Sequence, residues 1–396
     1  MKKLIAISVM IALIAGAVFA ETSVAGAIES RLNVYEGVFG DHGPGYDGGF
    51  PKPTTAGSFG TAWIALSGNN DDGTLGGMFR LRGQDIVESD FRWHRVFVWW
   101  KPIPQMRVFL GQDADGMFET GQLTSWAFHQ GSESFLTVHN WDYWRNIFPG
   151  NWDTFGAALS FYLVPGLDLN LVIPTGQPTG WPRHHNAAVT RKSELETIYP
   201  GSLQLTAGYN IADVGKVAFA WIGSGENYFA DSFEVGKLGK IALSFYSGAL
   251  VDGLQFQVGG STDLWKGADD LAPISVGAAV HFGMGDFGVK FRAGCDLDMT
   301  DAGGMFITAN VMPTYVTPVG KVCLDIGGSF NKANSDADMD YGFWVNPYLK
   351  TGLSGGYFQV GIMFLNNING GQGGNIDVKV DDKPRVYLPI VMGFNF

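Results

Sequence analysis

The last eleven residues restrict the fold of this chain more than any other segment. Every second residue counted back from Phe396 is apolar, and this apolar face consists of Val386, Leu388, Ile390, Met392, Phe394 and Phe396. A period of two is the pattern of a β-strand whose two faces meet different surroundings. No later residues follow to cover the face, so we expect a lipid bilayer to cover it. A membrane-spanning barrel strand needs about 9–11 residues of this kind. An edge strand of a soluble sandwich is the alternative.

The first twenty residues have the three parts of a secretory signal peptide. Met1–Lys3 is basic, Leu4–Val18 is apolar, and Val18-Phe19-Ala20 has the form of a cleavage site. The sequence therefore predicts a signal peptide at 1–20 and one mature domain at 21–396. No later segment has the roughly 18 consecutive apolar residues of a membrane helix. We expect the mature chain to be secreted or to enter a membrane through strands.

Segments of alternating apolar residues recur along the mature chain. Clear examples are 167–173, 287–293, 322–326 and 358–364, and a period of 180° per residue fits them better than helical spacing. Short and long connections alternate between such segments. We expect short connections at 101–104, 164–166, 211–215, 248–253, 282–286, 317–320 and 351–356, and long ones, rich in Gly, Asp and Asn, at 112–154, 174–201, 223–238, 329–340 and 366–385.

Composition agrees with strands that face lipid. Only 16% of residues are charged, whereas 14% are aromatic and 56 are glycine, which is unusual for a protein surrounded by water. The formal net charge of −12 argues against a nucleic-acid partner. Apolar and polar side chains alternate in a membrane barrel, so a low mean hydropathy is compatible with one.

The C-terminal pattern, with a final Phe and apolar residues at alternate upstream positions, resembles the C-terminal signature of Gram-negative outer-membrane β-barrels. The resemblance implies that Phe396, Phe394, Met392 and Ile390 form the assembly signal read by the barrel assembly machinery, and that outer-membrane lipids surround the wall. Short turns alternating with long loops fit the same architecture. We predict an all-β, antiparallel, up-and-down transmembrane barrel of about 18 strands, with 16 as the alternative. Short turns would face the periplasm and long loops the exterior, and the interior would be too wide for wall side chains to fill.

Four arginines have the inward parity in neighbouring predicted strands. They are Arg80, Arg82, Arg95 and Arg107. Arg95 shares its parity with aromatic residues, but an arginine at the bilayer midplane of a barrel costs about 2–4 kcal/mol. We therefore expect the residues that share the parity of Arg95 to face the barrel interior. This orientation places Trp93 and Trp99 inward and Val96, Val98 and Trp100 toward lipid. The functional interpretation is a basic wall that sets selectivity, and the alternative is a set of ordinary solvated wall residues.

The long segment 112–154 resembles the inward-folded constriction loop of porins, in which acidic loop residues face a basic wall. Its acidic candidates are Asp113, Asp115, Glu119, Glu133 and Asp142. The segment departs from the porin pattern because it lacks a Pro-Glu-Phe-Gly motif and is dense in tryptophan. Trp93, Trp99 and Trp126 could form an aromatic track of the kind found in sugar-specific porins. They could equally be interfacial girdle residues.

Other chemistry is weakly indicated. The histidines have no metal-ligand spacing, and Asp336, Asp338 and Asp340 lack the glycine and glutamate of a calcium loop. The glycine cluster 370–374 is not placed as a phosphate cradle. We expect no cofactor, no metal, no enzyme activity and no nucleic acid. Cys295 and Cys323 have opposite parities, so we expect them to stay unpaired.

The sequence thus favours an outer-membrane porin, a passive diffusion channel for small hydrophilic solutes with 112–154 as its constriction. Homotrimers are implied by the resemblance. The alternatives are a substrate-specific channel of the sugar or fatty-acid type and a soluble secreted β-sheet binding protein. The preferred solute and ion are left open, because a basic wall and an acidic loop have opposite effects.

Overall fold

The computed structural model describes residues 21–38, 54–83, 91–113, 154–176, 204–222, 237–265, 274–297, 304–332, 335–366 and 384–395. The predicted signal peptide and residue Phe396 lie outside these ranges. Within them, no helix is long and apolar enough to cross a membrane.

The described residues form one continuous antiparallel sheet. Its first strands are β1 (Glu21–Val38), β2 (Thr54–Asn69), β3 (Leu75–Gly83), β4 (Phe91–Ile103), β5 (Met106–Asp113), β6 (Thr154–Phe161), β7 (Leu167–Gly176), β8 (Gln204–Ile211) and β9 (Gly215–Ile222). The remaining strands are β10 (Lys237–Val251), β11 (Leu254–Trp265), β12 (Ile274–Met284), β13 (Phe287–Leu297), β14 (Met305–Thr317), β15 (Gly320–Lys332), β16 (Asp340–Leu353), β17 (Gly356–Gly361), β18 (Met363–Asn366) and β19 (Arg385–Asn395).

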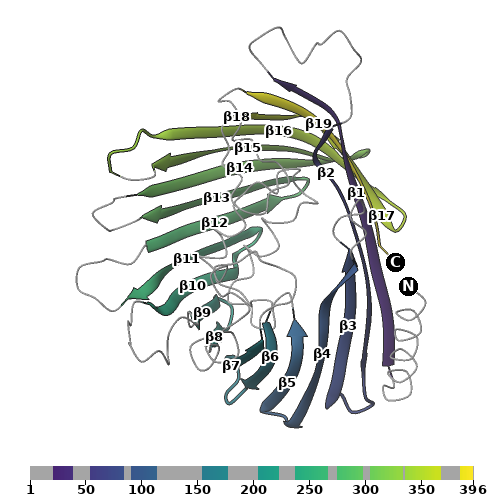
Figure 1. Cartoon of the computed structure of the whole chain (residues 1–396), viewed down its shortest axis with the longest axis vertical. Coiled ribbons are helices and arrows are strands. Elements are labelled where there is room, and N and C mark those ends of the chain that lie inside the picture. The colour runs from purple at the N-terminus through teal and green to yellow at the C-terminus, as the bar shows by residue number, and fades with distance from the viewer. Residues whose placement is uncertain are drawn as a thin grey trace.

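The sheet closes on itself, because the first strand pairs with the last. Ala27 of β1 lies opposite Asn395 of β19, and the pairing continues to Val38 opposite Arg385. Figure 1 shows β1 between β19 and β2, with the other strands following in chain order round the wall. A closed barrel leaves no sheet edge exposed, which is the requirement for β-structure in lipid.

β17 and β18 are two halves of one wall crossing. Both pair with β16 on one side and with β19 on the other, in a register that continues across the break. Ile362 donates its N–H to the carbonyl of Pro347 at 3.0 Å, but Pro347 has no N–H to return. On the other side the register places Gly361 opposite Pro389, which also lacks a donor. The 19 strands therefore make 18 crossings, as predicted.

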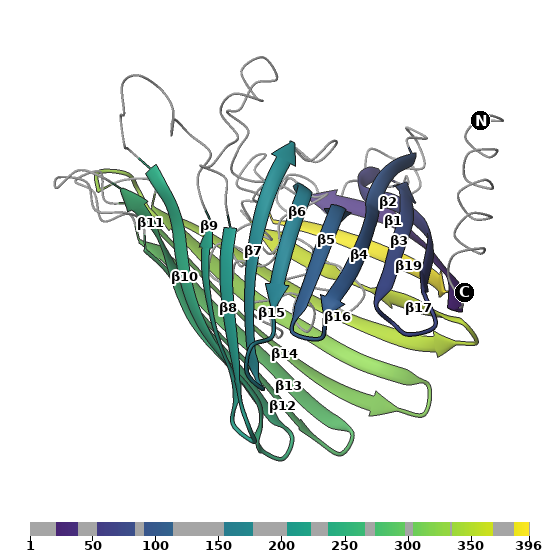
Figure 2. The ribbon, with the colours of Figure 1, turned by 90° about the horizontal axis from the view of Figure 1, so that it is seen from below.

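Short turns lie on one rim, here called the short-turn rim. They span 70–74, 104–105, 162–166, 212–214, 252–253, 285–286, 318–319 and 354–355. Each of the seven predicted short connections overlaps one of these turns, although β4 and β10 extend into the predicted ranges 101–104 and 248–253. The turn at 70–74 is an eighth. The start of β1 lies on this rim, since Glu21 pairs with Asn69, and so does the end of β19, since Asn395 donates to the Gly355 carbonyl. Figure 2 shows the tilted strands and these hairpins. The opposite end is called the long-loop rim.

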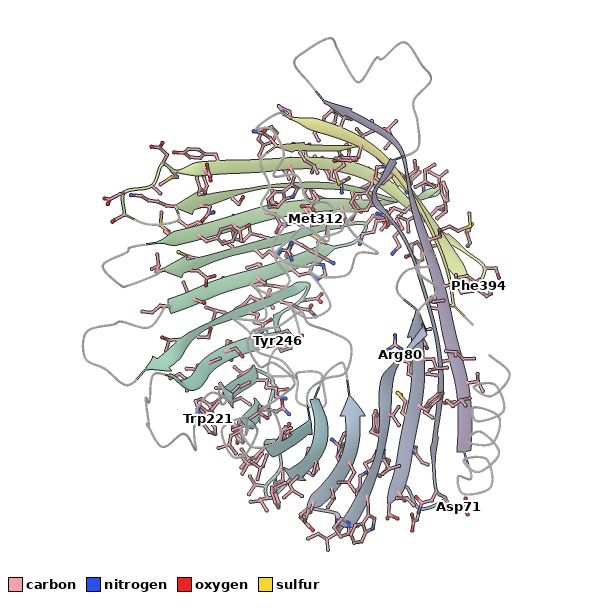
Figure 3. The ribbon with its side chains drawn as sticks, viewed as in Figure 1. Asp71, Arg80, Trp221, Tyr246, Met312 and Phe394 are labelled. Atoms are coloured by element: carbon pink, nitrogen blue, oxygen red, sulfur yellow. The ribbon has the colours of Figure 1, made fainter. Side chains whose placement is uncertain are left out.

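The outer face of the barrel is apolar. Met392 and Phe394 are 56% and 49% exposed, so the apolar face of the last strand points away from the barrel interior (Figure 3). Exposed outward aromatic residues occur near both rims: Trp100, Tyr209 and Tyr315 near the short-turn rim, and Phe330, Tyr341 and Phe343 near the long-loop rim. Phe330 and Tyr341 pair across β15 and β16 with ring centroids 5.3 Å apart. Two aromatic belts around an apolar band are typical of outer-membrane barrels.

The two cysteines confirm the predicted register. Cys323 is buried on the inner parity of β15, whereas Cys295 has the outer parity of Phe291 on β13. Neither Cys295 nor Cys323 forms a disulfide.

Candidate functional site: the inner wall

Arg80 and Arg107 lie on the inner wall. Arg80 points into the barrel in Figure 3, and its guanidinium carbon lies 4.2 Å from the centroid of the Trp63 ring. Arg107 of β5 lies directly opposite Ser160 of β6. The Arg107 Nε atom and the Ser160 hydroxyl are both buried without a hydrogen-bond partner. A buried polar group without a hydrogen-bond partner costs about 1–3 kcal/mol, so the wall is destabilised at this position.

A register shift corrects one sequence expectation. Arg80 of β3 pairs with Arg95 of β4, but the next residue, Leu81, pairs with Trp93, so His94 is an extra residue. Simple alternation placed Trp93 and Arg95 on the same face of β4, but the extra residue places them in rows of opposite parity. Arg95 pairs with Arg80 of the inner row, and Trp93 pairs with Leu81 of the outer row. Beyond the shift, Arg82 pairs with Arg92. Parity counting across 91–95 missed Arg92, because a β-bulge leaves no mark in this sequence.

Trp99 faces inward, and Trp100 faces outward. Trp99 packs beside an inner cluster formed by Phe109, Ala158 and Val172. Its ring lies against Gly76, where an added Cβ would overlap the ring, and the Lys101 ammonium lies 5.0 Å from the ring centroid. A sugar stacking on Trp99 would have to compete with this lysine. Trp100 is 53% exposed and belongs to the outer aromatic belt.

The predicted loop residues are only partly within the described ranges. Asp113 is the last residue of β5 and pairs with Thr154, the first of β6, so the segment between them begins and ends at adjacent strands. Asp115, Glu119, Glu133, Asp142 and Trp126 lie outside the described residues.

Sequence reasoning missed a buried polar chain, here called the polar chain, on the inner wall of β13–β16. The Arg292 Nε–H donates to Asn310 Oδ1 at 2.7 Å, and Asn310 Nδ2 donates to Asp325 Oδ1 at 2.9 Å. Trp344 Nε1–H donates to the same Asp325 oxygen at 3.2 Å. Each of these four side chains is at most 8% exposed. The Asp325 carboxylate thus accepts hydrogen bonds from β14 and β16, and Asn310 connects it to the Arg292 guanidinium on β13.

A second inner-wall pair lies close to the short-turn rim. Lys216 of β9 reaches across Gly208 of β8 to Asp168 of β7, with Nζ 3.5 Å from Oδ2. Any side chain at Gly208 would meet the lysine stem. Beside this pair, Asn170 donates to the Thr206 hydroxyl at 3.0 Å.

Cations predominate on the described inner wall, although the whole chain is acidic. The described inward-facing cations are Arg80, Lys101, Arg107, Lys216, Lys290, Arg292, Lys321 and Lys350, whereas the carboxylates are Asp168, Asp296, Asp325 and Asp340. Asp168 faces Lys216, and Asp325 accepts the donors of the polar chain. The wall therefore presents a net positive surface to its interior.

No protein-family model and no curated protein matches the sequence. Solved structures do match. OccK3 of Pseudomonas aeruginosa is 8% identical, with a TM-score of 0.57 over 96% of this chain and 97% of that one. The outer membrane protein opdK of Pseudomonas aeruginosa is 9% identical, with a TM-score of 0.57 over 96% and 99%. An anion-selective porin from Comamonas acidovorans is 13% identical, with a TM-score of 0.50 over 95% and 100%. The chain therefore has the fold of outer-membrane porins, a closed antiparallel barrel of 18 crossings.

Proposed function

We propose that this protein is an outer-membrane porin, a passive channel for small hydrophilic solutes that prefers anions. The observation that carries the preference is the excess of cations over carboxylates on the described part of the inner wall, in a chain that is acidic as a whole. A barrel of 18 crossings belongs to the size range of aqueous channels, and charge lining such a channel selects ions by sign. The structurally similar porin from Comamonas acidovorans is described as anion-selective.

Planar-bilayer recording tests the proposal. In a salt gradient the purified protein should give ohmic conductance with a reversal potential that indicates anion preference. Replacing Arg80 and Arg107 together by Gln should move the reversal potential toward cation preference. Lys332→Gln is the matched control, because Lys332 has the outer parity of Phe330 at the long-loop rim. An unchanged potential in the double variant would remove these arginines from selectivity, and absence of conductance in the wild type would overturn the channel.

The segment 112–154 is proposed as the constriction. Support comes from its acidic residues, which would face a basic wall, and from the pairing of Asp113 with Thr154 that anchors both of its ends. Acidic groups opposite cations in a narrow pore create a transverse field that orients polar solutes. Deleting residues 120–148 should raise single-channel conductance. Equal conductance would place the segment outside the pore.

The last strand is proposed as the assembly signal and as part of the lipid-facing wall. Ile390, Met392 and Phe394 lie on the outer parity of β19, which pairs with β1 to close the barrel. The barrel assembly machinery, outer-membrane lipids and further copies in a homotrimer are the corresponding partners. Deleting Phe396 should lower the yield of inserted protein and leave the conductance of inserted molecules unchanged.

A further inference from the structure

A continuous row of polar side chains crosses four adjacent strands of the inner wall near the short-turn rim. Arg107 of β5 lies opposite Ser160 of β6. Ser160 in turn lies opposite Asn170 of β7, and Asn170 lies opposite Thr206 of β8. These strands lie side by side in the wall (Figure 1), and residues directly opposite each other point to the same face. With strands about 4.7–4.9 Å apart, the row is about 14 Å long. We call these four residues the Arg107 row.

The β5 end of the row is basic. Lys101 of β4 comes directly after Trp100, which lies opposite Val108 of β5, so Lys101 is next to Arg107 on the inner wall. The Lys101 side chain is exposed, and its ammonium lies 5.0 Å from the centroid of the Trp99 ring. Two cations on neighbouring strands therefore face the interior at this end, and together they attract an anionic group.

The middle of the row has hydrogen-bonding groups without partners. Ser160 is 0% exposed, and neither its hydroxyl nor the Arg107 Nε atom has a hydrogen-bond partner. Asn170 Nδ2 donates to the Thr206 hydroxyl at 3.0 Å, which leaves Asn170 Oδ1 able to accept and the Thr206 O–H able to donate. Arg107 is partly exposed, and its long side chain has several rotamers. A change of rotamer at Arg107 would uncover the Ser160 hydroxyl for a ligand that binds the guanidinium.

An apolar row borders the Arg107 row on the side of the long-loop rim. It consists of Trp99, Phe109, Ala158 and Val172, of which Trp99 is partly exposed and the other three are buried. On the other side, the Asp168 carboxylate lies 3.5 Å from the ammonium of a lysine on β9. The Arg107 row thus lies between an apolar strip and an ion pair. A ligand that carries an acid, a polar edge and an apolar face would match this arrangement.

We propose that Lys101 and the Arg107 row bind a sugar acid, a pyranose ring that carries a carboxylate. The carboxylate lies between Lys101 and Arg107, where charge-assisted hydrogen bonds are stronger than neutral ones. The ring hydroxyls meet Ser160, Asn170 and Thr206, which can both donate and accept. A neutral sugar leaves the two cations without an anion, and a simple carboxylate leaves the polar groups beyond Arg107 without hydroxyls. The site deepens the proposed anion channel and rests on it, because a solute reaches the inner wall through the lumen.

Isothermal titration calorimetry on the full mature protein in detergent tests the site with sodium galacturonate, galactose and sodium acetate as probes. Galacturonate carries both the acid and the ring hydroxyls, so it should bind more tightly than galactose, which lacks the acid, and than acetate, which lacks the ring. Arg107→Gln should weaken the binding of galacturonate and of acetate. Thr206→Val should weaken the binding of galacturonate and leave that of acetate unchanged.

Ser160→Ala should have opposite effects on folding and on binding. Removal of a buried hydroxyl that has no partner should raise the unfolding free energy, whereas galacturonate binding should weaken about 10-fold, which corresponds to the loss of one hydrogen bond. Ser247→Ala is the matched control, since Ser247 of β10 is also 0% exposed and its hydroxyl also lacks a hydrogen-bond partner. The control should change stability in the same direction and leave galacturonate binding unchanged.

The outcomes separate this site from the channel. Anion-selective conductance with galacturonate bound no more tightly than acetate, or galacturonate binding unchanged in Ser160→Ala and Thr206→Val, overturns the site and leaves the channel. Galacturonate binding that depends on Ser160 and Thr206 in a protein without conductance supports the site and overturns the channel. Equal weakening in Ser160→Ala and Ser247→Ala would indicate a general effect on the wall and also overturns the assignment to the Arg107 row. Circular dichroism and heat-dependent gel mobility verify that each variant is folded.

Discussion

The polar chain and the pair formed by Arg107 and Ser160 lie on the same inner wall, but their polar groups have opposite surroundings. In the polar chain, Arg292 is linked through Asn310 to Asp325, which also accepts from Trp344. Across β5 and β6, Arg107 faces Ser160, and the Arg107 Nε atom and the Ser160 hydroxyl are buried without a hydrogen-bond partner. The polar groups of the first arrangement are bonded to one another within the wall, whereas two polar atoms of the second are not. Charges of the inner wall therefore differ in their partners as well as in their sign.

The largest effect should come from breaking the polar chain. Asp325→Ala removes the acceptor for Asn310 and Trp344 and leaves Arg292 as a buried charge without its carboxylate. Removing one partner of a buried ionic arrangement costs about 3–5 kcal/mol. Equilibrium unfolding in detergent should show a loss of this size. Asp340→Ala is the control, because Asp340 is an exposed carboxylate on the inner parity of β16. Equal unfolding free energies for the two variants would mean that the chain does not stabilise the wall.

Gly327 leaves the space that the Trp344 side chain of the polar chain occupies. The Trp344 ring lies over Gly327, and an added Cβ would overlap it. Gly327→Ala should therefore displace the indole and its bond to Asp325, at a cost of about 1–3 kcal/mol. Gly328→Ala is the matched control on the outer face, where an added Cβ would meet only the Gly342 carbonyl oxygen at 3.1 Å. Trp fluorescence and unfolding measurements should change in the first variant more than in the second. The reverse order would show that Trp344 is not fixed by its fit to Gly327.

The outer face was predictable from the sequence, but the partners on the inner wall were only partly so. Side chains that face lipid are apolar along the whole outer face of each strand, so the outward positions of Leu110, Val322 and Met392 follow from simple alternation. A two-residue turn also fixes register, and the turn 354–355 places Gln359 opposite Lys350 by counting. The pairings of Arg292 with Asn310 and of Lys321 with Lys350 cross long connections, whose lengths do not fix register. The extra residue at His94 also could not be predicted, because a β-bulge within a strand leaves no mark in the alternation of this sequence.

The smallest effect concerns a carboxylate that is satisfied but faces water. In the turn 70–74, Asp72 accepts from the Thr74 hydroxyl at 2.6 Å and from the Thr74 N–H at 3.0 Å. These bonds hold the pKa of Asp72 below its ordinary value of 3.8. The ionised form is therefore favoured in the fold.

Because the pKa of Asp72 is lowered, its ionised form stabilises the turn at pH values above the ordinary pKa. This contribution disappears as the pH falls through the lowered pKa. Thr74→Val removes the hydroxyl donor and should raise the pKa of Asp72 toward 3.8, whereas Thr74→Ser keeps the donor and should not. Carboxyl-carbon NMR titration distinguishes them. The global unfolding free energy should change far less than in Asp325→Ala, since solvent replaces the lost bond at an exposed turn. If Thr74→Val lowered the unfolding free energy as much as Asp325→Ala, burial would not distinguish the carboxylates that stabilise this barrel from those that do not.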